Sequence, residues 1–274
     1  MRCVPTRWFG VLATIALLVM LSSCSSQPVV TAAAQKDAAF YWSAAKECYM
    51  AGDYLKAIAH LDHLTEAGNP YNSRALPFAV VLTSGVASGY MELADYYAAG
   101  AKANKRKATI FQSKAADYRA LANHVVLLFA EDTRKLSQVE GDSIQLAFGP
   151  PKGNFAEPVL LTQISHGMIP AQTDEEAALQ FALDRGVLLS VCDSAGAPNN
   201  LAKAGELLQR GEFLVRRSKF TKAVADQLQK ESQLYARNKL DDSQKMEMLR
   251  QMSRDVVKDP GASRTAMAMQ VPSR

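Results

Sequence analysis

The chain has 274 residues and a net charge of +4 at neutral pH, and 48% of its residues are hydrophobic. This length allows one large domain or two small ones, and the small excess of positive charge argues against a nucleic-acid partner. Alanine, leucine, glutamine and lysine are frequent, whereas runs of β-branched residues are few. This composition favours helices over strands.

The first 24 residues have the pattern of an export signal. Arg2 and Arg7 form a cationic start, and an apolar run over 11–21 is too short to span a bilayer. Two serines then precede Cys24. The order Leu21-Ser22-Ser23-Cys24 resembles the lipobox of bacterial lipoproteins, in which cleavage precedes the cysteine and that cysteine receives acyl chains.

The lipobox resemblance implies that residues 1–23 are a signal peptide. It also implies that Cys24 carries a lipid, such as palmitate, which holds the mature protein on a membrane. Ser25 stands where the inner-membrane retention signal has Asp. The resemblance therefore implies the periplasmic face of the outer membrane of a diderm bacterium. The alternative is a signal peptide cut elsewhere, with an ordinary cysteine at 24. Residues 24–35 are small and polar, which is typical of a flexible tether.

Helical patterning begins near Lys36. Apolar and small residues recur at three- and four-residue spacing over 41–49 and again over 54–64, which predicts two helices. Gly52-Asp53 separates them, because glycine can end a helix in the left-handed conformation and Asp53 can cap the next helix. Gly68-Asn69-Pro70 closes the second helix.

This predicted hairpin resembles one tetratricopeptide (TPR) repeat. The match consists of Ala45 at the small-residue position, Gly52-Asp53-Tyr54 at the turn, Ala57-Ile58 in the second helix and Pro70 near the end. Small side chains at Ala45 and Ala57 let two antiparallel helices approach closely. The resemblance implies stacked hairpins with a concave binding surface.

A second copy of the hairpin is predicted near residue 215. Leu207, Gly211 and Leu214 precede a predicted turn at Ser218-Lys219, and the order Phe220-x-x-Ala223-Val224 follows it, as in Tyr54 to Ile58. The fold class expected is mainly α, with antiparallel helical hairpins. They form either a TPR-like solenoid or a generic bundle.

Between the two predicted copies, the spacing predicts long helices over 73–100 and 104–136. The first is apolar nearly all round and should be the central helix, and the second begins with a basic cluster. A Gly/Pro-rich insert at 138–172 interrupts the pattern, with short strands or extended segments expected at 143–148 and 158–164. The basic cluster consists of Lys102, Lys105, Arg106 and Lys107.

Helix resumes at Thr173, where Thr173 and Glu176 fit a capping box, and continues to Cys192. A last helix is expected from Asp241. We expect one helical domain over 36–258 and a disordered tail over 259–274.

The segment from Leu82 to Phe129 resembles the T-component lipoproteins of periplasmic TRAP transporters. The matching residues are Ser84-Gly85, Gly89-Tyr90 and Asp117-Tyr118-Arg119-Ala120-Leu121. The resemblance implies a helical body that binds a small apolar or acidic solute, or a solute-binding protein. The chain departs from this family in having Trp42 as its one tryptophan after the leader. A solute site predicts an enclosed apolar pocket among Phe78, Tyr90, Tyr97 and Phe111.

The two cysteines that follow Cys24 leave two alternatives open. In an oxidising periplasm Cys48 and Cys192 can form a disulfide, or each can be a separate buried thiol in an alanine-rich helix. We expect no cofactor and no metal site.

The four histidines give no strong catalytic or metal signal. His60 and His63 sit at a spacing that metals use, but solvent-facing histidines are the commoner cause of it. His124 lies in an apolar stripe, which is typical of a hydrogen-bonded core histidine. His166 lies in the insert, yet no nucleophile motif accompanies it, so a hydrolase is the least favoured function.

The function expected is that of a non-enzymatic envelope lipoprotein that binds a protein partner along a groove between hairpins. A TRAP T-component-like accessory that binds a small solute is the alternative. The residues expected to line the groove lie on the first helices of the two predicted hairpins: Lys46, Glu47, Met50, Glu206, Gln209 and Arg210.

Overall fold

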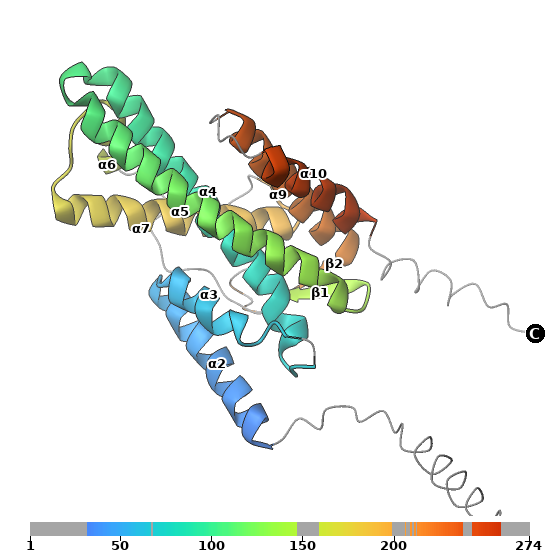
Figure 1. Ribbon diagram of the computed structural model, residues 1–274. Helices are drawn as coiled ribbons and strands as arrows, with labels where there is room; N and C mark the ends of the chain where they lie inside the picture. Colours follow the sequence, from blue (N-terminus) through green and yellow to red (C-terminus); the bar gives the residue numbers. More distant parts are fainter. Residues whose placement is uncertain are drawn as a thin grey trace, which may run out of the picture.

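The computed structural model describes residues 32–66, 68–146, 159–198, 206, 209, 211, 213–237 and 243–258. Over these residues the protein is mainly helical, with one two-stranded sheet (Figure 1). This confirms the predicted fold class. The predicted signal peptide over 1–23, the predicted lipidation site Cys24 and the predicted disordered tail over 259–274 lie outside the described residues.

Helices α2 (Ala32–Ala51) and α3 (Tyr54–Asp62) form the first predicted hairpin. Gly52 has φ of 83°, and the N–H groups of Gly52 and Asp53 donate to the carbonyls of Tyr49 and Cys48. Two details differ from expectation. Helix α2 begins inside the segment predicted as tether, and Asp53 makes no side-chain cap because its carboxylate pairs with Lys56.

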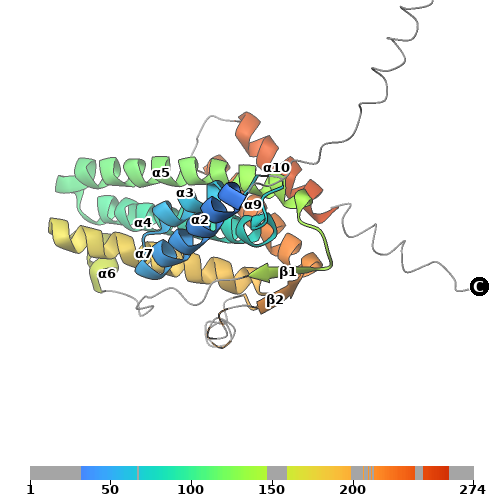
Figure 2. The ribbon, with the colours of Figure 1, turned by 90° about the horizontal axis from the view of Figure 1, so that it is seen from below.

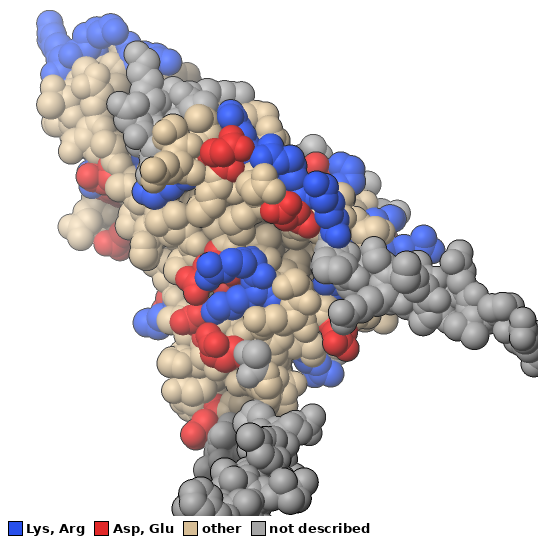
Figure 3. Space-filling view, turned by 45° about the vertical axis from the view of Figure 1, so that its right-hand side comes forward, with Lys and Arg blue, Asp and Glu red and all other residues tan. Residues whose placement is uncertain are grey.

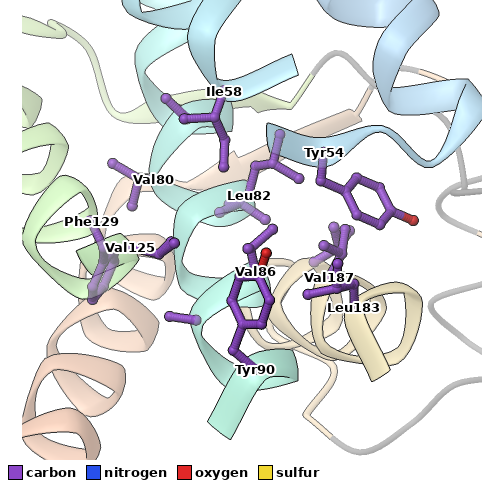
Figure 4. Close-up of a cluster of buried hydrophobic side chains, with 14 of the residues drawn as sticks. Tyr54, Ile58, Val80, Leu82, Val86, Tyr90, Val125, Phe129, Leu183 and Val187 are labelled. Atoms are coloured by element: carbon purple, nitrogen blue, oxygen red, sulfur yellow. The ribbon is translucent and has the colours of Figure 1, made fainter. Parts of the chain in front are cut away.

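The two long helices α4 (Asn72–Ala103) and α5 (Ala108–Lys135) form an antiparallel hairpin, joined by the 3-10 turn η1 (Lys105–Lys107). Helix α4 is the one described helix long and apolar enough to cross a membrane. However, 89% of its apolar window is buried against its neighbours, so it is the central core helix that the composition predicts. Figure 4 shows its side chains meeting those of α3, α5 and α7.

Helix α7 (Gln172–Ser194) packs on the side of α4 opposite to α5, so that α5, α4 and α7 form three layers (Figure 2). The helices touch through their backbones at Gly85, Gly89 and Gly186. A Cβ on Gly186 would lie 2.3 Å from the carbonyl oxygen of Gly85 and 2.7 Å from the nitrogen of Gly89. The predicted capping box is wrong: Ala171 occupies the N-cap and no side chain bonds there.

Two short segments of the predicted insert have regular structure. Strand β1 (Ser143–Leu146) confirms the first expected strand, but the second expected strand is helix α6 (Val159–Ser165). Leu161 and Ile164, one turn apart, are buried on α4, where Gly100 leaves room for the backbone of α6. The prediction failed because a short apolar run fits strand and helix equally.

The second TPR-like hairpin is not formed. Phe213–Arg216 is strand β2, and the predicted turn at Ser218-Lys219 lies inside helix α9 (Arg217–Arg237). Strand β2 pairs antiparallel with β1, and Ile144 opposite Val215 and Leu146 opposite Phe213 are all buried. Alternation of buried and exposed residues along β2 is the strand pattern, which the helical interpretation overlooked.

The last helix α10 (Ser243–Val257) confirms the predicted C-terminal helix and packs mainly on α9. Where α9 begins, Arg217 is only 2% exposed. Its guanidinium donates to the carbonyl oxygens of Val139 and Leu136, and its N–H donates to Asp142 at 2.8 Å. Arg217 therefore fixes helices α9 and α10 to the segment that follows α5, at the end of the α4–α5 hairpin.

The structure decides between the two alternatives for the cysteines. Cys48 and Cys192 are both free thiols, so the disulfide is not formed. Burial raises the pKa of Cys192 to about 11. Cys192 therefore remains a protonated, small apolar side chain in the core at neutral pH.

Candidate functional site

A groove of about 320 Å³ runs between α3 and α5, with Ala79 of α4 at its floor. Its walls are apolar and its rim carries one histidine. Figure 4 shows Ile58 of α3 and Val125 of α5 on either side of α4. The main lining side chains are Leu55, Ile58, Val125 and Leu128, followed by the carboxyl groups of Asp62, Glu131 and Asp132, and by His124.

Helical spacing explains why apolar and acidic residues share this groove. On α5, Val125, Leu128 and Asp132 are three and four residues apart, so they lie on the same face. On α3, Leu55, Ile58 and Asp62 repeat the same spacing. Each helix therefore presents two apolar residues followed, one turn later, by a carboxyl group.

Asp132 is the most unusual group in the groove because it is an acid that is only 7% exposed. Burial raises its pKa to about 7, nearby Asp62 and Glu131 also raise it, and Lys135 lowers it. Asp132 is therefore protonated much more readily than an ordinary carboxyl group, and a cation that binds beside it favours the ionised form. Perturbed carboxyl groups in apolar pockets are typical of functional sites.

The pKa of Asp132 predicts a pH effect on stability. Because folding raises this pKa, the stabilising contribution of the protonated form is complete below pH 4 and is lost as the pH rises through 7. We expect Asp132→Asn to raise the free energy of unfolding by roughly 2 kcal/mol at pH 8 and by little at pH 4. Urea titrations across this range measure the difference. Glu140→Gln, at an exposed acid, controls for the lost charge, and parallel curves for Asp132→Asn and the unmodified protein would contradict the prediction.

One lysine partly balances the acidic end of the groove. Lys135 Nζ lies 3.3 Å from Glu66 Oε1, 3.6 Å from Glu131 Oε1 and 3.3 Å from Thr65 Oγ1. Asp62 and Asp132 bring the number of nearby carboxyl groups to four, so the single positive charge of Lys135 does not balance them. In the part of the chain that the structure describes, no group of three His, Cys, Asp or Glu side chains could hold a metal.

The residues that the sequence predicted for partner binding lie elsewhere. Lys46, Glu47 and Met50 are exposed on α2, where Lys46 sits over the ring of Trp42 at 5.9 Å. Glu206 and Gln209 are exposed, and Arg210 lies outside the described residues. None of the five described residues among them lines the α3–α5 groove.

Among the four histidines, His124 differs from expectation. His124 is exposed at the groove, so its interpretation as a core histidine is wrong. His60 and His63 lie beside Tyr41 of α2, and the ring of His63 stacks on Tyr41 at 4.2 Å. His166 is exposed in the turn between α6 and α7.

The apolar pocket expected for a solute is filled by its own side chains. Tyr97 lies 6.1 Å from Phe111 and 5.6 Å from Tyr118, between ring centroids, and Phe78 packs edge-on against Tyr49. The hydroxyl of Tyr118 donates to Glu175. The four residues predicted to line the pocket are thus buried in the core, and each packs on a neighbouring ring: Phe78, Tyr90, Tyr97 and Phe111.

A second cleft, of about 560 Å³, lies between α4 and α9 and contains the buried Glu231. Burial raises the pKa of Glu231 to about 7. Its carboxylate accepts from Gln227, which also donates to Ser88 of α4 at 3.1 Å. Glu231 is thus tied into the α4–α9 contact, whereas the α3–α5 groove is walled by apolar side chains.

No protein-family model, no curated protein and no solved structure matches this chain. The function must therefore be inferred from the residues of the groove and from the leader sequence.

Proposed function

We propose that this protein is an envelope lipoprotein, anchored through Cys24, that binds an apolar segment of a protein partner in the α3–α5 groove. The segment carries a lysine or arginine that reaches Asp62, Glu131 and Asp132. The observation that supports this function is the composition of the groove, which has apolar walls that end at three carboxyl groups. Apolar walls give affinity through burial, and the carboxyl groups select a cationic end.

The same groove favours binding over catalysis. Its described lining contains no serine, threonine or cysteine that could act as a nucleophile. It also disfavours the acidic solute implied by the TRAP T-component resemblance, because a second anion would meet the carboxyl groups at close range. An apolar solute without an anionic group remains the alternative ligand.

The partner can be trapped in intact cells. A photo-crosslinking benzoylphenylalanine at Leu55, which is exposed at the groove, should crosslink to one envelope protein through a segment that contains lysine or arginine. Asp62→Asn combined with Glu131→Gln should reduce the yield about 30-fold, since each of the two charge-assisted contacts contributes on the order of 1 kcal/mol. The measurement is mass spectrometry of the crosslinked peptide.

Two controls separate the groove from the anchor. The same crosslinker at Leu214, exposed on β2, should not trap the partner. Cys24→Ser should release the protein from the membrane fraction. If crosslinking at Leu55 is unchanged by the acid substitutions, the groove is not the binding site. If the Cys24→Ser protein stays in the membrane fraction, the anchor is not Cys24.

A further inference from the structure

The turn between α4 and α5 forms a basic end of the molecule, which we call the basic tip: Lys102, Lys105, Arg106 and Lys107. All four side chains are exposed, and none forms an ion pair with an acid of the described chain. Figure 3 shows Lys and Arg gathered at this end. No acidic residue occurs between Asp95 and Asp117. The positive charge of the tip is therefore not neutralised along the chain.

Large apolar side chains are exposed at the same end. Ile110, in the first turn of α5, is 51% exposed, and Met168 and Ile169, between α6 and α7, are 50% and 41% exposed. Solvent-exposed side chains of this size normally occur singly. Here three of them accompany four cations at two adjacent turns.

The two turns are held together, so the apolar and basic residues form one surface. The side chain of Asn104 donates to the carbonyl of Gly167 at 2.9 Å, and Asn104 also accepts from the N–H of Lys107. A Cβ on Gly167 would lie 2.6 Å from the Asn104 side chain, so the turns are in direct contact. The backbone of this surface is therefore held in place before binding.

We infer that the basic tip, with Ile110, Met168 and Ile169, docks on an anionic lipid surface. Cations near such a surface are attracted to headgroup phosphates, and apolar side chains enter the boundary between headgroups and acyl chains. An acidic protein would also satisfy the cations, and the competition with poly-glutamate described below distinguishes it from a lipid surface. The tip lies at the opposite end of the body from the start of α2 (Figure 1). Docking at the tip can therefore be tested separately from the proposed lipid anchor and from the groove.

The test places a tryptophan in the tip of the chain from residue 24 onward, without the apolar leader. Ile110→Trp is combined with Cys24→Ser, so that no acyl chain contributes, and its fluorescence is compared with that of the Cys24→Ser parent. Vesicles contain brominated acyl chains, which quench a tryptophan that enters the lipid. We expect quenching with vesicles of phosphatidylglycerol and phosphatidylcholine, little with phosphatidylcholine alone, and loss of quenching at 0.5 M NaCl.

A matched variant and a charge variant complete the test. Leu214→Trp, at a residue 71% exposed on β2, should show no such quenching. Each basic residue near an anionic surface strengthens partitioning about fivefold, so Lys105→Gln, Arg106→Gln and Lys107→Gln together should weaken it about 100-fold. Equal quenching at both positions, equal quenching with neutral vesicles, or no effect of the charge variant would overturn the inference. Soluble poly-glutamate that displaces the tip from vesicles at equal charge concentration would also overturn it in favour of an acidic protein.

Discussion

Gly186→Ala should lower the free energy of unfolding by about 3 kcal/mol. Alanine is the better helix former by about 1 kcal/mol, so an effect of propensity alone would have the opposite sign. The added methyl would lie 2.3 Å from the carbonyl oxygen of Gly85, and backbone cannot move aside as a side chain can. Helix α7 would have to move away from α4 and open the core. Thermal and urea unfolding followed by circular dichroism measure this change.

Gly68→Ala is the matched control for this prediction. Gly68 has φ of 86° but no atom within 4 Å of an added Cβ, so the substitution brings backbone strain without a clash. We expect a loss of about 1 kcal/mol there. A Gly186→Ala protein as stable as the Gly68→Ala protein would show that the α4–α7 contact is looser than the structure describes.

Arg217→Met should be as damaging, with a loss of about 3 kcal/mol. Methionine keeps much of the apolar stem but leaves the carbonyl oxygens of Leu136 and Val139 without the donor that they have in the folded protein. Buried carbonyls that lose a charged donor carry the full cost of their desolvation. Because Arg217 lies where β2 meets α9, proteolysis should increase first in α9 and α10. Urea unfolding and limited proteolysis are the measurements.

Arg216→Met controls for the loss of one positive charge at the neighbouring position. Arg216 is exposed, so its replacement should change stability by less than about 0.5 kcal/mol. Arg217→Lys is a second comparison, since lysine keeps the charge but lacks the planar fork that reaches two carbonyls. Equal stabilities for the Arg216 and Arg217 variants would contradict a structural role for the buried guanidinium.

The sequence was sufficient to predict most helices because their signals are local. Helices α4, α7 and α10 show helical spacing of apolar residues, and Gly52 marks the end of α2 as predicted. The second hairpin failed because the spacing of Phe220, Ala223 and Val224 fits any buried helix face. The sequence predicted β1 as a strand, but the pairing of β2 with a segment some 70 residues earlier cannot be inferred from local spacing.

The groove could not be predicted because it requires two helices that are distant in the chain. Ile58 and Val125 each read as ordinary core residues, and only the packing of α3 and α5 on α4 brings them to one cavity. One signal was available: Asp132 falls on the same helical face as Val125 and Leu128, where an acid is unexpected. The expected groove residues, chosen from the first helices of hairpins, depended on a repeat stack that the second hairpin does not form.

The final helical pair has a consequence for how this protein is degraded. Helices α9 and α10 pack chiefly on each other and meet the remainder along β2, at Arg217 and through side chains of α4, α5 and α7. Such a pair can detach as one cooperative piece while the three-layered centre stays closed. The earliest cleavage by a protease should then remove the C-terminal quarter and leave a trimmed fragment with the groove and the basic tip intact.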